Sequence, residues 1–162
     1  MNPTLKLVIL DVDGVMTNGS KLYDWNHQVI AKEYNDKDFT AIKRFKKCGV
    51  SVCLLSGDNC VNEGMAKTRN IDFFYSRNKL SMLPNLFSRY RCSNKNTAYI
   101  GDDIFDIPVL REVEFSFCPS DAVEDVVEQT RHVLSSCGGS GVVAEMYSWF
   151  VNNGFLPKRV ML

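Results

Sequence analysis

The chain has 162 residues, which is enough for one domain with a sizeable hydrophobic core. Its 19 lysine and arginine side chains are balanced by 19 aspartate and glutamate side chains, so the composition does not favour binding to nucleic acid or to an anionic membrane surface. No apolar run approaches the length of a membrane span. We therefore expect a single domain over residues 1–162, with no nucleic acid and no membrane among its partners.

The first predicted element is a buried strand, Leu5–Leu10, which is followed at once by Asp11 and Asp13. A near-continuous apolar strand is typical of the centre of a parallel sheet that is covered on both faces. The carboxyl ends of such strands face the ligand crevice, so two aspartates at this place are candidates for chemistry. An ordinary turn is the alternative at this point, because Asp-x-Asp-Gly also occurs in turns that have no chemical role.

An inserted β-hairpin is expected over residues 17–34, directly after the first strand. An Asn-Gly dipeptide marks a turn at its start, and the pieces Lys21–Trp25 and Gln28–Tyr34 carry apolar and aromatic side chains. His27 falls in the polar break between these two pieces, and we assign it to the turn.

Strands and helices alternate through the rest of the chain, which predicts an α/β fold with a doubly wound parallel sheet. Further strands are expected at Val50–Leu55, Ile71–Tyr75, Thr97–Gly101, Phe115–Cys118 and His132–Leu134. Helices are expected at Asp36–Cys48, Cys60–Thr68, Leu80–Arg91, Ser120–Thr130 and Val142–Val151. Pro84 is expected to kink the third of these helices or to delay its start. A tail over residues 154–162 follows, and no linker or repeat divides the chain.

Polar side chains gather where the predicted strands end. The segment Ser56–Asn59 lies between a strand and a helix N-terminus, an arrangement that can bind an anion. Lys79 follows the next strand, and Asp102, Asp103 and Asp106 follow the one after it. Three carboxylates at one strand end are costly without a nearby cation, although helix capping explains one or two of them. Carboxylates with a hydroxyl and a lysine fit magnesium-assisted phosphoryl transfer, because Mg²⁺ takes carboxylate and phosphate oxygens.

The six cysteines contain no Cys-x-x-Cys pair, which is typical of free thiols in a reducing compartment. The first strand begins close to the start of the chain, without an apolar leader before it. We therefore expect a cytoplasmic location and no zinc or disulfide site.

The motifs DVDGV, LLSG, Lys79 and GDDIFD, in this order, resemble the four motifs of the haloacid dehalogenase superfamily of phosphatases. The phrases DVDGVMTNG, KEYNDKDFTAIK, RNKL, GDDIFDIPVL and GGSG further resemble its small capless branch, which acts on 3-deoxy-octulosonate 8-phosphate and nonulosonate 9-phosphates. This second resemblance covers nearly the whole chain. It implies a Rossmann-like fold with a β-hairpin insert after strand one and no cap domain.

The resemblance also implies roles for the residues at the strand ends. Asp11 would be the nucleophile, and Asp13 would be the general acid and then the general base. The remaining catalytic residues would be Ser56 and Lys79. The phosphate- and substrate-binding residues would be Ser56, Gly57, Asp58, Asn59 and Lys79. Mg²⁺ would be held by the side chains of Asp11 and Asp102 and by the backbone carbonyl of Asp13. Asp103 and Asp106 would lie in or near the layer of residues that surrounds these ligands.

Two positions depart from this resemblance and bear on the substrate. Asp58 stands where the octulosonate enzymes tend to have an arginine, and Ala144 stands where an arginine usually follows the glycine-rich loop. Such an arginine could pair with the carboxylate of a sugar acid, whereas Asp58 is expected to repel it and to accept hydrogen bonds. We therefore expect a nonulosonate 9-phosphate to be preferred, with Lys158 and Arg159 from a neighbouring subunit's tail as replacement cations.

Two other functions fit parts of the pattern. This domain also occurs fused to sialic acid cytidylyltransferases, so a non-catalytic or oligomerising role beside such an enzyme is one alternative. A response-regulator receiver is the other, but its phosphorylated aspartate ends the third strand and not the first. The resemblance and the apolar hairpin lead us to expect a homotetramer, in which four hairpins pack together and neighbouring subunits close each site.

Overall fold

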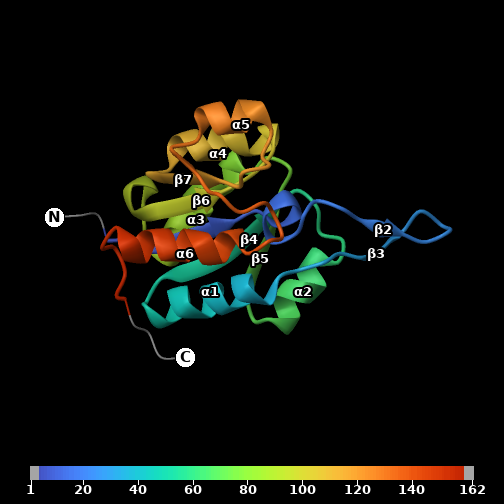
Figure 1. Cartoon of the computed structure of the whole chain (residues 1–162), viewed down its shortest axis with the longest axis horizontal. Coiled ribbons are helices and arrows are strands. Elements are labelled where there is room, and N and C mark those ends of the chain that lie inside the picture. The colour runs from blue at the N-terminus through green and yellow to red at the C-terminus, as the bar shows by residue number, and fades with distance from the viewer. Residues whose placement is uncertain (1–3, 159–162) are drawn as a thin grey trace.

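The computed structural model describes residues 4–158, which form a layered α/β fold from which one hairpin projects (Figure 1). The strands are β1 (Leu7–Leu10), β2 (Leu22–Tyr23), β3 (Val29–Ala31), β4 (Ser51–Ser56), β5 (Asp72–Tyr75), β6 (Thr97–Ile100), β7 (Phe115–Cys118) and β8 (His132–Val133). The α-helices are α1 (Asp36–Lys47), α2 (Asn62–Thr68), α3 (Leu83–Tyr90), α4 (Ile107–Glu112), α5 (Glu124–Gln129) and α6 (Val142–Asn152). Within the described residues, no helix is long and apolar enough to cross a membrane.

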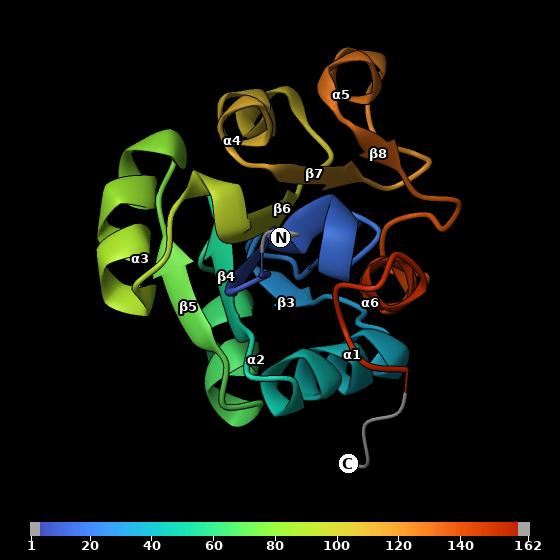
Figure 2. The same cartoon turned by 90° about the vertical axis from the view of Figure 1, so that its left-hand side faces the viewer.

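Six strands form one sheet in the order β5-β4-β1-β6-β7-β8, and every neighbouring pair is parallel. Helices α1 and α6 cover one face of this sheet, and α3, α4 and α5 cover the other (Figure 2). The doubly wound α/β fold predicted from the sequence is therefore confirmed. Because all six strands run the same way, their carboxyl ends meet at a single edge, and β1 delivers Asp11 to the middle of it.

The central strand β1 shows why an unbroken apolar run is required there. Val8 and Leu10 pack into the core under α1 and α6, while Leu7 and Ile9 pack into the core on the opposite face. All four side chains are fully buried. A polar residue at any of these positions would leave unpaired polar atoms in one of the two cores.

Three helices start later than the sequence predicts, each for a local reason. Helix α2 begins at Asn62, because Val61 before it has a left-handed φ of 64°. The predicted start at Leu80 is a 3₁₀ turn over Leu80–Met82, and helix α3 itself begins at Leu83 with Pro84 in its first turn, so the proline does not kink it. Helix α5 begins only at Glu124, because the residues from Ser120 onward form turns.

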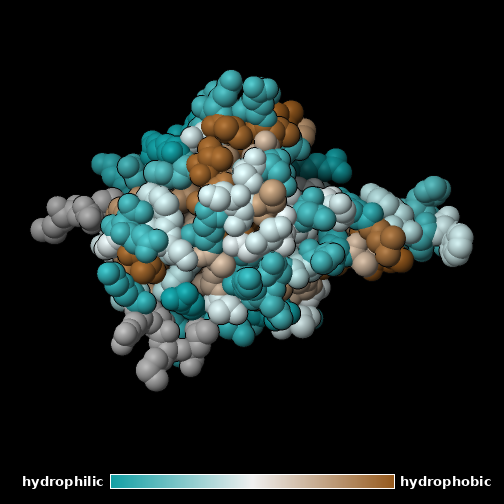
Figure 3. Space-filling view, viewed as in Figure 1, coloured by the Kyte–Doolittle hydropathy of each residue, from teal (hydrophilic) through white to brown (hydrophobic). Residues whose placement is uncertain are grey.

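The hairpin β2–β3 extends away from the body of the domain and exposes apolar side chains (Figure 3). The large hydrophobic residues exposed on it are Leu22, Tyr23, Trp25 and Ile30, and Trp25 is 96% exposed. His27 lies in the turn between the strands, with a left-handed φ of 58°. The described part of the tail lies at the opposite end of the domain, where Leu156 is buried and Lys158 is exposed (Figure 1); Arg159 lies outside the described residues.

Candidate active site

A cavity of about 620 Å³ opens at the edge of the sheet where the parallel strands end. The predicted site residues in its lining are Asp11, Asp13, Ser56, Gly57, Asp58, Lys79, Asp102, Asp103 and Asp106. Asn59 is the predicted residue that the lining does not include, and it is exposed. The other lining residues are Gly14, Gly19, Lys21, Arg77 and Phe105.

Lys79 enters the site from the segment after β5 and is buried between two carboxylates. Its Nζ atom lies 2.8 Å from Oδ1 of Asp11 and 2.6 Å from Oδ1 of Asp106. Burial alone would lower the pKa of Lys79, but the negative charges of Asp11 and Asp106 outweigh burial and raise this pKa above its ordinary value. Lys79 is therefore favoured as a cation, and it touches Asp11.

Asp106 has both carboxylate oxygens occupied by donors. Its Oδ1 accepts hydrogen bonds from Lys79 and from a buried tyrosine hydroxyl, and its Oδ2 accepts the backbone N–H groups of Asp102 and Asp103. These contacts fit a supporting role, in which Asp106 fixes Lys79 and the backbone at Asp102. Asp103 caps the following turn, since its Oδ1 accepts the N–H of Ile104 at 2.7 Å, so helix capping accounts for this carboxylate.

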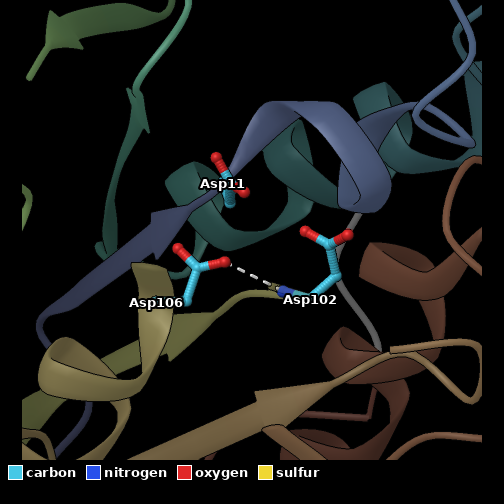
Figure 4. Close-up of side chains that lie close together, drawn as sticks. All are labelled: Asp11, Asp102 and Asp106. Carbon is cyan, nitrogen blue, oxygen red and sulfur yellow. Dashed lines mark hydrogen bonds between the residues drawn. The ribbon is translucent and has the colours of Figure 1, made fainter. Parts of the chain in front are cut away.

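Three carboxylates converge on one spot beside β1. Oxygen atoms of Asp11, Asp102 and Asp106 lie within 4.8 Å of one another (Figure 4). Oδ1 of Asp102 is buried and has no hydrogen-bond partner among the described residues. Burial, together with the charge of Asp106, raises the pKa of Asp102 to about 7 and that of Asp11 well above its usual range. Crowded, desolvated carboxylates with an unpaired oxygen fit a divalent cation such as Mg²⁺, which prefers oxygen ligands.

The loop after β4 forms a second corner of the cavity. Ser56 is buried at the strand end, and its Oγ accepts the N–H of Asp58 at 3.1 Å. The sequence predicts a helix N-terminus close behind Gly57, and this is wrong in detail, because α2 begins only at Asn62. The loop itself, and not a helix end, therefore faces the cavity at Ser56 and Gly57.

Asp58 is paired with lysines, whereas the sequence leads us to expect its negative charge to repel a substrate carboxylate. Its Oδ2 lies 2.7 Å from Nζ of Lys21 and 3.1 Å from Nζ of Lys32. Burial acts to raise the pKa of Asp58, but hydrogen bonds from Lys21 and from the backbone N–H of Cys60 lower it to about 2. The repulsion that we expected Asp58 to exert on a substrate carboxylate is therefore offset by the two lysines.

Two polar residues that the sequence does not single out lie behind the cavity. Lys32 follows β3 and contacts Asp13 and Asp58, and Asn62 opens α2 with its side chain fully buried. The partners of Lys32 are 19 and 26 residues away along the chain, so the local pattern cannot distinguish it from a surface lysine.

Comparison with known proteins gives consistent matches over most of the chain. A family model described as haloacid dehalogenase-like hydrolase matches residues 73–146. The 3-deoxy-D-manno-octulosonate 8-phosphate phosphatase KdsC of Haemophilus influenzae is 34% identical over 145 residues, which are 88% of this chain and 80% of that protein. The enzyme of the same name from Escherichia coli K12 is 30% identical and covers 88% of this chain and 77% of its own length. The cobalt-bound structure of the Haemophilus influenzae phosphatase YrbI matches with a TM-score of 0.87 and 33% identity, over 93% of this chain and 89% of that one.

Proposed function

The chain belongs to the haloacid dehalogenase-like hydrolases, among which it is a phosphoric monoester hydrolase, and we propose that its substrate is a sugar-acid phosphate bound in the cavity beside β1. The observation that carries this proposal is the contact between Asp11 and the buried cation Lys79 inside a cavity that Asp13, Ser56 and Asp102 also line. A nucleophile, an acid, a hydroxyl and a cation at one place are the parts that phosphoryl transfer requires.

In the first step, a carboxylate oxygen of Asp11 attacks phosphorus and the bond from phosphorus to the ester oxygen breaks. Asp13 gives its proton to that departing oxygen, which leaves as an alcohol. Lys79 contacts Asp11 at 2.8 Å, so its charge can stabilise the phosphoryl oxygens as the new bond forms. Ser56 and Gly57 face the same cavity and would hold one phosphate oxygen.

In the second step, water attacks the phosphorus of the aspartyl phosphate. Asp13, now a carboxylate, takes the proton of this water, so the same residue serves as acid and then as base. The bond between phosphorus and the Asp11 oxygen breaks, which releases inorganic phosphate and restores the carboxylate of Asp11.

Asp11, Asp102 and the backbone carbonyl of Asp13 would hold Mg²⁺, which when bound neutralises the charge gathered on the phosphate and the carboxylates. The unpaired Oδ1 of Asp102 and the raised pKa values of Asp11 and Asp102 support this assignment. We assign Asp106 to the residues behind the Mg²⁺ ligands and not to the ligands themselves, because its two carboxylate oxygens already accept four hydrogen bonds.

Exhaustive chelation of divalent ions is expected to abolish phosphate release, with a loss of about 100-fold or more, and added Mg²⁺ is expected to restore it. Mg²⁺ should also raise the melting temperature of the protein, since a ligand that binds only the folded state stabilises it. Calorimetry with and without Mg²⁺ measures this second effect independently of turnover. Full activity after chelation would rule out the metal assignment.

The preferred substrate that we propose is a nonulosonate 9-phosphate, ahead of 3-deoxy-octulosonate 8-phosphate. The lack of an arginine at position 58, directly after Gly57, supports this preference. The charge of Asp58 does not support it, because Lys21 and Lys32 neutralise this charge. Lys21 and Arg77 line the cavity and are cations that could meet the carboxylate of either sugar acid.

The test of this proposal is the release of inorganic phosphate from the two sugar-acid phosphates side by side. We expect kcat/KM to be at least about tenfold higher for the nonulosonate 9-phosphate, which corresponds to about 1.4 kcal/mol of transition-state discrimination. A tenfold preference for the octulosonate would overturn the choice of sugar and leave the phosphatase proposal standing. Hydrolysis of neither compound would contradict the proposed substrate class.

We also propose that the protein assembles into homotetramers through its hairpins. Four large apolar side chains on β2, β3 and the turn between them are exposed, which favours burial against other subunits. Light scattering at micromolar concentration is expected to give four times the chain mass of 18.4 kDa. A monomer under these conditions would contradict the proposal.

A further inference from the structure

A buried lysine lies behind the cavity and takes no part in the steps described so far. Lys32 follows β3, at the base of the hairpin, and its side chain has no exposed surface. The cavity lining includes Asp13 and Asp58 but not Lys32. Lys32 is therefore placed to act on the site through these two carboxylates and not through direct contact with the substrate.

The ammonium group of Lys32 has three acceptor groups for its three protons. Its Nζ donates a hydrogen bond to Oδ2 of Asp13 at 3.0 Å and lies 2.7 Å from Oδ1, which accepts no hydrogen bond among the described residues. The same atom lies 3.1 Å from Oδ2 of Asp58 and 3.0 Å from Oδ1 of Asn62. A lysine without exposure is tolerated only when its charge is paired and its donors are used, and both conditions are met here.

Asn62 holds the same carboxylate from a second direction. Its Nδ2 donates to Oδ2 of Asp13 at 3.1 Å and lies 3.3 Å from Oγ of Ser56. Its Oδ1 accepts hydrogen bonds from Lys32 and from the hydroxyl of Tyr34, both at 3.0 Å. Nδ2 of Asn62 therefore faces acceptor groups, and Oδ1 faces donor groups. Exchanging these two amide atoms would break the hydrogen bonds, so only one orientation of the Asn62 side chain satisfies every contact.

These contacts fix Asp13 more tightly than a surface carboxylate would be fixed. The free-energy gain of a buried ion pair is offset by the loss of hydration, so stability alone is a weak reason for placing a lysine here. A general acid, in contrast, must stay within hydrogen-bond reach of the oxygen that it protonates.

We propose that Lys32, together with Asn62, is a positioning residue that holds the carboxyl group of Asp13 where this group, when protonated, delivers its proton to the leaving oxygen. The inference rests on the proposed phosphatase function. Because Lys32 directly follows β3 and Asn62 begins α2, the position of Asp13 depends on how the base of the hairpin packs against α2.

The test uses two kinds of leaving group. An ester of a primary alcohol needs a proton from the acid as it leaves, whereas p-nitrophenolate leaves readily without one. The constant kcat/KM reports the steps from free enzyme to the first transition state, in which the ester bond breaks, and excludes the later attack of water. The probes are the nonulosonate 9-phosphate, 3-deoxy-octulosonate 8-phosphate and p-nitrophenyl phosphate, each assayed with Mg²⁺.

For Lys32→Met we expect kcat/KM on the better sugar-acid phosphate to fall by about 100-fold or more, and that on p-nitrophenyl phosphate to fall by less than about fivefold. Lys43→Met removes an exposed lysine of α1 and serves as the matched control, with both constants unchanged. Asn62→Ala should show the same selective loss to a smaller degree, because Lys32 still contacts Asp13.

Equal losses on both kinds of substrate, or no loss on either, would overturn the role of Lys32 and leave the phosphatase proposal intact. A wild-type protein that hydrolyses none of the three phosphates would refute the proposed function, and this inference with it. If Lys32→Met does not fold, as judged by circular dichroism, the selectivity of Asn62→Ala decides the question by the same criterion.

Discussion

Replacing Asp11 by asparagine is expected to abolish turnover and leave the fold intact. A carboxamide cannot attack phosphorus as a carboxylate does, so we expect kcat to fall by at least about 10³-fold. The folded state should not lose stability, because burial and the charge of Asp106 already raise the pKa of Asp11 and make its ionised form costly. The rate of phosphate release measures the loss of turnover. The melting temperature measures the stability of the fold, and we expect it to be unchanged or higher.

The exposed Asp125 in the first turn of α5 provides a control for this substitution. Asp125→Asn makes the same chemical change at the surface and is expected to leave turnover unchanged. Asp13→Asn is also expected to lower the rate by orders of magnitude, because it removes the acid and base. A near-normal rate for Asp11→Asn in the presence of Mg²⁺ would show that another group attacks the phosphorus.

The strand ends show how far a sequence can locate a site of this kind. β1, β4 and β6 are apolar runs that stop at polar residues, and the sequence alone predicts each of these stops. Parallel strands joined by right-handed crossovers must end at the same edge, so Asp11, Ser56 and Asp102 were expected to meet there. The meeting of Asp11, Ser56 and Asp102 at the cavity therefore follows from the hydrophobic pattern and from one topological rule, whereas lining residues such as Lys21 and Arg77 do not.

The contacts among these residues could not be predicted in the same way. A hydrogen bond such as that from Lys32 to Asp13 depends on how the base of the hairpin packs against the edge of the sheet, and the hydrophobic periodicity of the sequence does not show this packing. Asp58 is an example of a wrong electrostatic expectation that arises when such contacts are unknown. Its charge is evident in the sequence, but the lysines that neutralise it come from a hairpin far away along the chain. Electrostatic predictions about a substrate therefore need the three-dimensional partners of each charge.

Gly14→Ala is expected to damage the site without removing any functional group. Gly14 has a left-handed φ of 84°, a conformation that costs an alanine about 1–2 kcal/mol. An added Cβ atom would lie 1.9 Å from Oδ2 of Asp102 and 2.2 Å from its Cγ, so the carboxylate or the turn must move. A displacement of about 1 Å in an active site can reduce the rate by about 100-fold, and we expect a loss of at least this size.

Gly64→Ala is the matched control, because a Cβ atom at this position of α2 would meet nothing within 4 Å. It is expected to leave kcat unchanged and to stabilise the helix by up to about 1 kcal/mol. If Asp102 holds the cation, Gly14→Ala should also raise the Mg²⁺ concentration needed for half-maximal activity, whereas Gly64→Ala should not. Normal turnover with normal Mg²⁺ activation in Gly14→Ala would mean that Asp102 can move freely, and that its placement against Gly14 has no part in the reaction.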